Sequence, residues 1–541
     1  MLGAQCDRVR SNQRRPLRRF RLEFNLPAGF YCRKLSRGCD MERHGPVTPD
    51  VQGQRDSIFL REPAPSRSLS RLGVYPWLVV CITCLGAFAG QVDASIVQLG
   101  LPTLEQAFDA SLDQVSWVAV GYSLAFAAVL PVYARLAEIA GRKLMYLLGF
   151  ALFGLFSALC GLAPSLPWLI AFRVLQGMSG ALLGANSIVI LVAATNQTQR
   201  GRAMGLFASA QAIGVSTGPA LGGLMLDNFS WHWIFWVTIP VAALGTALGW
   251  VLVPVSTPLS RKTAFDWGGA TLLIPGLSGL MMTLTELNAW GPLSPALLAC
   301  AASAVVLLTG FVWWERRVPA PLIDLGLFRS RAFTGGTVAV LLSYAMLYGM
   351  FFALSFALVR GYHDTPVSAG LRLAIIPVAL GVVAPFSASL AKQWPRLVTK
   401  GSMGLCAAAA IGLSQTLTGS PSSEPAMMIL LATYGVGLGL FIAPNNSATL
   451  AAASAEHAGQ AGGLLNLMRA FGTASGVAAA SALLAWRVEL ATGVHGRTMG
   501  VSEQALLRAA SDVMILLAAL AMAAAFAASF ADRRQARVHS A

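Results

Sequence analysis

Long apolar runs separated by short polar segments fill the chain from Tyr75 onward. Each run has about 20 residues, which is enough for an α-helix to cross the hydrocarbon core of a bilayer. The pattern predicts an all-α polytopic membrane protein with about fourteen spans. The seventh and eighth spans are the weakest, because Gly and Pro interrupt the seventh. The expected ranges are 75–99, 113–134, 144–163, 166–192, 203–226, 233–254, 267–288, 294–315, 334–358, 367–390, 401–419, 426–449, 460–485 and 510–530.

Charges in the loops test this count. If the N-terminus is inside, every even-numbered span ends in the cytoplasm, where Lys and Arg are enriched. The loops after the even spans, and the tail, contain Arg135, Arg142, Lys143, Arg200, Arg202, Arg261, Lys262, Arg316, Arg317, Arg329, Arg331, Lys392, Arg396, Lys400, Arg533, Arg534 and Arg537. The loop after span twelve and the basic residues near the ninth and thirteenth loops are exceptions. The asymmetry predicts that both termini are cytoplasmic.

Composition supports a membrane location. Of the 541 residues, 55% are hydrophobic and 12% are charged, whereas a soluble globular protein has roughly 25% charged residues. The formal net charge of +15 would suit nucleic acid or an anionic membrane surface. Because the basic residues gather in the first 72 residues, the short loops and the tail, they indicate membrane topology and no nucleic-acid partner.

Residues 1–72 have a different composition, rich in Arg, Pro and Ser, with no apolar run of spanning length. They also lack the apolar stretch and small-residue cleavage site of a secretory signal. We expect a disordered basic cytoplasmic head. Met41 offers a second start, so the sequence leaves open whether residues 1–40 are translated.

Ionisable residues inside the predicted spans are few, since each costs at least about 2.5 kcal/mol at the bilayer centre. Asp93 in span one and Arg173 in span four are expected at matching depths, roughly 9 and 10 Å from the outer surface. A carboxylate balanced between the cost of burial and the attraction of an arginine can take up and release a proton. We predict that these residues are the proton-coupling pair. The alternatives are a structural ion pair, or an Asp93 that reaches the outer interface.

Arg469 in span thirteen is expected roughly 13 Å from the inner surface. It is predicted to bind an anionic substrate group or to respond to the proton; extension of its side chain to the cytoplasm is an equal alternative. The substrate cavity is expected to be lined by apolar and aromatic residues. Trp117, Tyr122 and Asn186 are further candidates for that lining.

Span five carries glycines four residues apart, which let another helix approach closely. A proline among them removes a backbone donor and kinks the helix. The motif consists of Gly214, Gly218, Pro219, Gly222 and Gly223.

The loop at 134–143 joins spans two and three. Its carboxylate, Glu138, and the cations Arg142 and Lys143 can form and break ion pairs with helix ends as the two halves rock. A simple positively charged anchor would need only the cations, so Glu138 and Gly141 favour a cytoplasmic gate.

Together these segments resemble the major facilitator superfamily, specifically its fourteen-span drug:proton antiporter branch of the EmrB/QacA type. Residues 93–102 resemble the branch's first-span motif, and residues 134–143 resemble its G-x-L-A-D-R-x-G-R-K loop. Residues 214–223 resemble its antiporter motif. The R-x-x-Q-G-x-G motif of span four is matched by Arg173, Gln176, Gly177 and Gly180. The chain departs from the loop pattern at Ala134, where Gly is usual, and at Glu138, where Asp is usual.

The resemblance implies two six-helix bundles around a central cavity, with spans seven and eight inserted between them. The expected parts are a head at 1–72, an N-terminal six-helix bundle at 73–258, an inserted helix pair with its linker at 259–332, a C-terminal six-helix bundle at 333–532 and a basic cytoplasmic tail at 533–541.

The leading hypothesis is a proton-coupled antiporter of the bacterial inner membrane that exports small hydrophobic or amphipathic molecules by alternating access, as in multidrug efflux. A dedicated metabolite exporter or a proton symporter of the same fold is the alternative. A membrane enzyme or sensor is disfavoured, because the six His residues are scattered and no nucleotide-binding G-x-x-x-x-G-K-[ST] loop is present.

No cofactor is expected beyond the proton gradient. The eight cysteines are spread over apolar runs and the head, and we expect neither a metal site nor disulfides. The expected partners are a small-molecule substrate, protons and the lipid bilayer. The sequence leaves open the substrate's identity, the coupling stoichiometry, the oligomeric state, and whether a periplasmic adaptor and an outer-membrane channel take part.

Overall fold

The computed structural model describes residues 65, 73–256, 265–319, 321–394, 397–453, 457–493 and 497–538. Every regular element in these ranges is helical, as the apolar runs predict. Except for Pro65, the predicted head lies outside the described residues, as do the loop residues Arg261, Lys262, Arg396 and Glu456.

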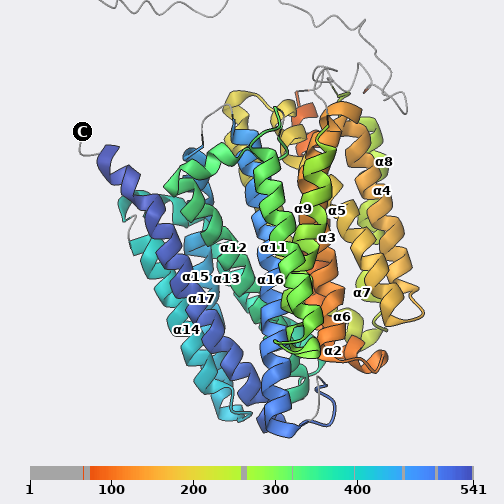
Figure 1. The fold of residues 1–541 in the computed structure, drawn as a ribbon, viewed down its shortest axis with the longest axis vertical. Coiled ribbons are helices and arrows are strands. Elements are labelled where there is room, and N and C mark those ends of the chain that lie inside the picture. The colour runs from red at the N-terminus through yellow and green to blue at the C-terminus, as the bar shows by residue number, and fades with distance from the viewer. Residues whose placement is uncertain are drawn as a thin grey trace, which may run out of the picture. The chain divides into compact units, whose positions relative to one another are not determined.

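The described helices follow the predicted spans in order (Figure 1). Their bounds are α2 Tyr75–Ala107, α3 Leu112–Ala140, α4 Arg142–Gly161, α5 Leu166–Ala194, α6 Gln197–Asn228, α7 Trp233–Trp236, α8 Ile239–Leu252, α9 Trp267–Thr285, α10 Leu287–Trp290, α11 Pro295–Glu315, η1 Leu325–Arg329, α12 Arg331–Phe356, η2 Ala357–Gly361, α13 Pro366–Gln393, η3 Leu397–Gly401, α14 Ser402–Thr416, η4 Pro421–Ser423, α15 Glu424–Ala451, α16 Ala458–Thr492 and α17 Glu503–Val538.

Within the described ranges, thirteen helical segments are long and apolar enough to cross a membrane, with α7 and α8 joined as one segment. The more polar α6 completes the fourteen predicted runs. Large apolar side chains such as Leu244, Val306 and Phe386 lie exposed on the outer surface of the helices. Lipid suits such a surface and water does not, so the chain is a multi-pass membrane protein.

The helices form two groups by their contacts. Within α2–α8, which we call the first bundle, α2 packs on α6, and α5 packs on α3 and α4. Within α12–α17, the second bundle, α12 packs on α16 and α17, and α13 packs on α15. The bundles meet where α3 lies against α16 and α6 lies against α13, and the α9–α11 pair contacts both α3 and α16. The predicted domain boundaries fall between these groups and stay a prediction.

The bundles have two opposite ends, which we name the first-loop end and the head end. The first-loop end carries the turn at 108–111, the segment at 362–365 and the segment at 497–502. The head end carries the turn at Gly141 and the starts of α6 and α16. Gly141 has a φ of 106°, a backbone conformation that residues with a Cβ rarely adopt. This glycine therefore permits the tight turn between α3 and α4.

The first predicted span ends too early. We expected it to stop at residue 99, but α2 continues to Ala107 with Pro102 inside it. Leu101, Leu104 and Glu105 are buried along this extension, so packing stabilises the helix beyond the Gly and Pro that suggested an end.

The glycines of α6 allow close packing against a helix of each bundle. A Cβ at Gly214 would lie 2.8 Å from the backbone oxygen of Phe88 on α2, and a Cβ at Gly218 would overlap Ser95. On its other side, α6 meets α13, because a Cβ at Gly223 would overlap the backbone oxygen of Pro366. Close approach on two sides explains why α6 is rich in small residues and poor in large apolar ones.

Candidate functional site

A charged pair lies inside the first bundle. Asp93 on α2 and Arg173 on α5 are 0% and 1% exposed, and Arg173 Nη1 donates to Asp93 Oδ2 at 2.7 Å. Gln176, one turn further along α5, donates from Nε2 to Asp93 Oδ1 at 2.9 Å. Its Oε1 accepts from Arg173 Nη1 at 2.6 Å. Each carboxylate oxygen of Asp93 therefore has its own donor.

A second set of contacts holds the pair in place. Arg173 Nε donates to the backbone oxygen of Val118 at 3.0 Å, and its guanidinium carbon lies 4.3 Å from the centre of the Tyr122 ring. Gln176 Nε2 also donates to Ser157 Oγ at 2.8 Å, and Thr238 Oγ1 donates to the same oxygen at 3.0 Å. Removing two charges from water is costly unless further hydrogen bonds satisfy them, and these contacts supply such bonds.

The residues of this network come from α2, α3, α4, α5 and the start of α8, all in the first bundle. Sequence reasoning named Asp93, Arg173 and Tyr122, and it placed Gln176 in a motif without a role. It missed Ser157 and Thr238. Asp93 lies fourteen positions (93 to 107), about 21 Å of helix, before the end of α2, because α2 extends beyond the predicted span.

The predicted cytoplasmic gate forms a local cluster. Among the described residues, Glu138 pairs with Arg135 at 2.5 Å and with Arg142 at 3.3 Å, and both partners belong to its own loop. Lys143 is buried, and its backbone N–H donates to Ser256 Oγ at 2.9 Å, which ties the loop to the segment after α8. These contacts lie within the first bundle, and the gating role stays a prediction.

The predicted cavity residues have separate partners. Asn186 is buried and donates to the backbone oxygen of Leu182 on its own helix. Tyr122 packs on Arg173, as described above. The guanidinium of Arg469 lies inside the interface between the bundles, where Nη1 donates to Gln211 Oε1 at 3.2 Å.

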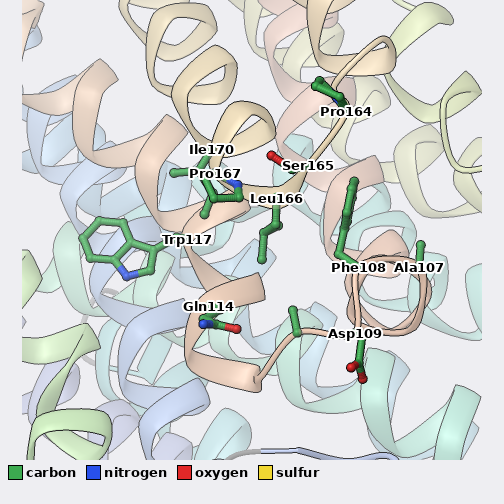
Figure 2. Close-up of a pocket in the computed structure, with 11 residues that line it drawn as sticks. Ala107, Phe108, Asp109, Gln114, Trp117, Pro164, Ser165, Leu166, Pro167 and Ile170 are labelled. Carbon is green, nitrogen blue, oxygen red and sulfur yellow. The ribbon is translucent and has the colours of Figure 1, made fainter.

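Trp117 belongs to a different place, the first-loop end. Its Nε1 donates to Glu286 Oε1 at 2.7 Å, and it lines a pocket of about 560 Å³ between the turn at 108–111 and the start of α5. Figure 2 shows Trp117 and Phe108 on opposite sides of this pocket, with Leu166 between them. Asp93, Arg173 and Gln176 are not among the residues that line this pocket.

A family model that matches most of the chain shows which family the chain belongs to. Residues 83–477 match the family described as Major Facilitator Superfamily. The chain belongs to this superfamily. It is therefore a membrane transporter of small molecules and not an enzyme, and the Asp93 network lies in the first of its two helix bundles.

Several relatives in the superfamily have names that refer to drug resistance or export. Multidrug resistance protein Stp of Mycobacterium tuberculosis is 33% identical over 76% of this chain and 76% of its own length. The tetracenomycin C resistance and export protein of Streptomyces glaucescens is 30% identical over 76% of this chain and 77% of its own length. Riboflavin transporter RibZ of Clostridioides difficile is 28% identical over 74% of this chain and 87% of its own length.

Solved structures agree on the fold. An auto-inhibited POT family peptide transporter matches 85% of this chain and 97% of its own, with a TM-score of 0.60 and 15% identity. An inward-facing, unoccupied bacterial homologue of the lysosomal transporter Spinster matches the same shares, with a TM-score of 0.57 and 15% identity. At such identity the likeness concerns the fold alone.

Proposed function

We propose that this transporter is a proton-coupled antiporter that exports small hydrophobic or amphipathic molecules. The observation that carries the proposal is the Asp93–Arg173–Gln176 network, because a fully buried carboxylate that accepts hydrogen bonds from two side chains has few roles in a membrane. Ionisable residues at such depth commonly belong to ion or substrate pathways.

Protonation of Asp93 would change the network in a defined way. A neutral carboxyl group no longer attracts the guanidinium of Arg173, which then retains the Gln176 and Val118 oxygens and the Tyr122 ring. The pair joins α2 to α5, so its loss alters the contact between these helices. In the proposed cycle a proton from the outer side binds Asp93 and favours release of the substrate outward.

Export is supported by the relatives, several of which carry drug-resistance names. We assign the chain to the fourteen-span branch, with both termini in the cytoplasm of a bacterium and the head end facing inward. The riboflavin transporter among the relatives supports a second candidate, a dedicated transporter of one metabolite in the same fold.

We further propose that the described state faces inward. At the first-loop end, Arg360 Nη2 of η2 donates to the backbone oxygen of Pro102 at 3.0 Å, and Arg497 pairs with Asp109 at 3.1 Å. Both contacts join the second bundle to the first, and they close the outer side in the assigned orientation.

Proton movement in everted membrane vesicles tests the function. A panel of dyes, antibiotics and lipophilic cations is added after an imposed pH gradient. We expect a transported compound to dissipate the gradient with the wild type and to do so at least tenfold more slowly with Asp93→Asn. Asp227→Asn is the matched control, because Asp227 is an exposed carboxylate at the first-loop end of α6.

Two other results of this experiment would change the proposed function. If Asp93→Asn dissipates the gradient like the wild type, antiport stands and Asp93 is structural. If no compound moves protons although the protein is folded in the membrane, the dedicated transporter becomes the better explanation.

A further inference from the structure

Arg469 occupies the interface between the two bundles. It lies on α16, and its guanidinium contacts one residue from each bundle. Nη1 donates to Gln211 Oε1 on α6 at 3.2 Å, and Cζ lies 5.1 Å from the centre of the Tyr344 ring on α12. Backbone contacts fix this part of α16 closely against α12, because a Cβ at Gly472 would overlap the backbone oxygen of Leu341. The guanidinium is thus held at a defined place.

The charge of Arg469 is not balanced by a nearby acid. Among the described residues, Arg469 takes part in no ion pair within 4.0 Å, and its Nε is buried without a hydrogen-bond partner. The contrast with Arg173 is direct, because that guanidinium has Asp93 at 2.7 Å. An unpaired cation inside a membrane protein is costly and commonly marks a substrate or ion pathway.

Three carboxylates elsewhere in the described spans have partners of their own. Asp93 is bonded to Arg173, Glu286 accepts from Trp117, and Glu105 accepts from the backbone N–H of Thr498 at 2.7 Å. The interface around Arg469 therefore offers a positive charge with neutral neighbours. An anion is the ligand that such surroundings attract.

The site is separate from the Asp93 network along the helix axis. Gly214 packs on Phe88 of α2, five positions before Asp93. Gln211 lies almost one further turn toward the head end of α6, which runs parallel to α2. The Arg469 contact is therefore roughly 10 Å nearer the head end than Asp93, at about 1.5 Å per residue.

We propose that Arg469, with Gln211 and Tyr344, binds the anionic group of an amphipathic organic substrate. The inference rests on the proposed transport function and names the substrate class. The unpartnered Nε and an Nη nitrogen form an edge that matches both oxygens of a carboxylate. Gln211, whose oxygen accepts from Nη1, lies beside this edge, and its amide can turn to donate an N–H to the ligand. The Tyr344 ring supports the guanidinium from its face.

Binding of two related dyes to the purified transporter tests this proposal. One probe is a xanthene dye with a free carboxylate, and the other is its ethyl ester, which has the same rings without the negative charge. Fluorescence anisotropy is measured in detergent with no proton gradient. We expect the wild type to bind the carboxylate dye at least tenfold more tightly than the ester. The ratio of the two dye affinities is measured without a proton gradient, so it can be determined even if the protein is not an antiporter. The test therefore distinguishes failure of this proposal from failure of the proposed antiport.

Three variants test whether the preference for the carboxylate dye arises at Arg469. Arg469→Gln is expected to reduce the ratio of the two affinities to about one, and Arg469→Lys to keep part of it. Gln211→Glu keeps the arginine and places an internal carboxylate beside it, so it is expected to abolish the preference without removing a buried charge. Arg317→Gln is the matched control, because Arg317 also lies over an aromatic ring, Trp313 at 3.7 Å, but it is exposed and follows the end of α11.

Several results would overturn the proposal. One is a wild type that binds the ester as tightly as the carboxylate dye, or that binds no carboxylate dye at all. Another is an unchanged affinity ratio in both Arg469→Gln and Gln211→Glu. An equal loss of preference in Arg317→Gln would assign the effect to surface charge.

Discussion

Asp93 and Glu105 lie on the same helix, α2, and both are fully buried, yet their partners differ in location. Asp93 is bonded to Arg173 and Gln176 within the first bundle. Glu105 is bonded to the backbone N–H and the hydroxyl of Thr498, between α16 and α17, and Arg360 lies 3.8 Å away. Contacts inside one bundle survive relative movement of the bundles, whereas contacts between bundles stabilise only the state in which they form.

The two ends of α6 show the same difference. At the first-loop end, Gly223 touches α13, as described above. At the head end, Gly201 and Gly205 have no described atom of another element within 4 Å of a Cβ position, and the same holds for Gly459 and Gly462 at the start of α16. Along α6, the close contact with the second bundle therefore lies at the first-loop end, where a transport cycle would have to break it.

The largest effect is expected from removing the carboxylate of the Asp93 network. Asp93→Ala leaves the guanidinium of Arg173 buried with no acid, a change that costs about 3–5 kcal/mol. We expect a large drop in the thermal denaturation temperature of the purified protein. The double variant Asp93→Asn with Arg173→Gln should recover part of the loss, because it removes both charges together.

A small effect of Asp93→Ala, below about 1 kcal/mol, would contradict this account of the buried pair, since the loss of one partner is the costly change. It would mean that water reaches Arg173 from one side of the membrane in the described state.

A smaller effect is expected at the contact between bundles. Glu105→Gln keeps the shape of the side chain and weakens hydrogen bonds to a charged group, which contribute about 1.5–3 kcal/mol. The equilibrium constant for closing the first-loop end should fall about tenfold, since 1.4 kcal/mol corresponds to a factor of ten. Oxidative cross-linking between Asp109→Cys and Arg497→Cys measures closure, and we expect at least a fivefold slower reaction.

Glu503→Gln provides the control for that experiment. Glu503 pairs with His363 at 2.7 Å at the same end, but both residues are exposed and both belong to the second bundle. Cross-linking should be unchanged in this variant. Equal rates in Glu105→Gln and the wild type would show that the Glu105 contacts do not determine closure.

The sequence predicted the helices well because lipid requires long, uniformly apolar runs. It also predicted that Asp93 and Arg173 could pair, since both charges were expected at matching depth. Ser157 was not predictable, because a serine in a span commonly donates to its own helix, as Ser157 does to Phe153 at 2.8 Å. The contact of Glu105 with Thr498 spans 393 positions, and no periodic pattern within either bundle fixes the register between them.

The smallest effect is expected at Asp364, an acid at the first-loop end between η2 and α13. Arg372 Nη1 lies 3.3 Å from its Oδ2, and Glu424 binds the same arginine at 2.8 Å. Burial raises the pKa of Asp364, and the charge of Glu424 adds to the rise while Arg372 opposes it. An acid whose pKa is higher in the folded state costs stability when ionised, and that cost disappears as the pH falls through the folded-state pKa.

Asp364→Asn should therefore stabilise the protein at neutral pH by less than about 1 kcal/mol. The difference from the wild type should shrink toward zero as the pH falls to about 4, where an ordinary aspartate is itself protonated. Arg372 keeps Glu424 as a partner, so the variant leaves no bare cation. Denaturation temperatures of both proteins across this pH range measure the effect. A variant less stable than the wild type at neutral pH would mean that the attraction of Arg372 outweighs burial, and Asp364 would then resemble Asp93, an acid held by its arginine within one bundle.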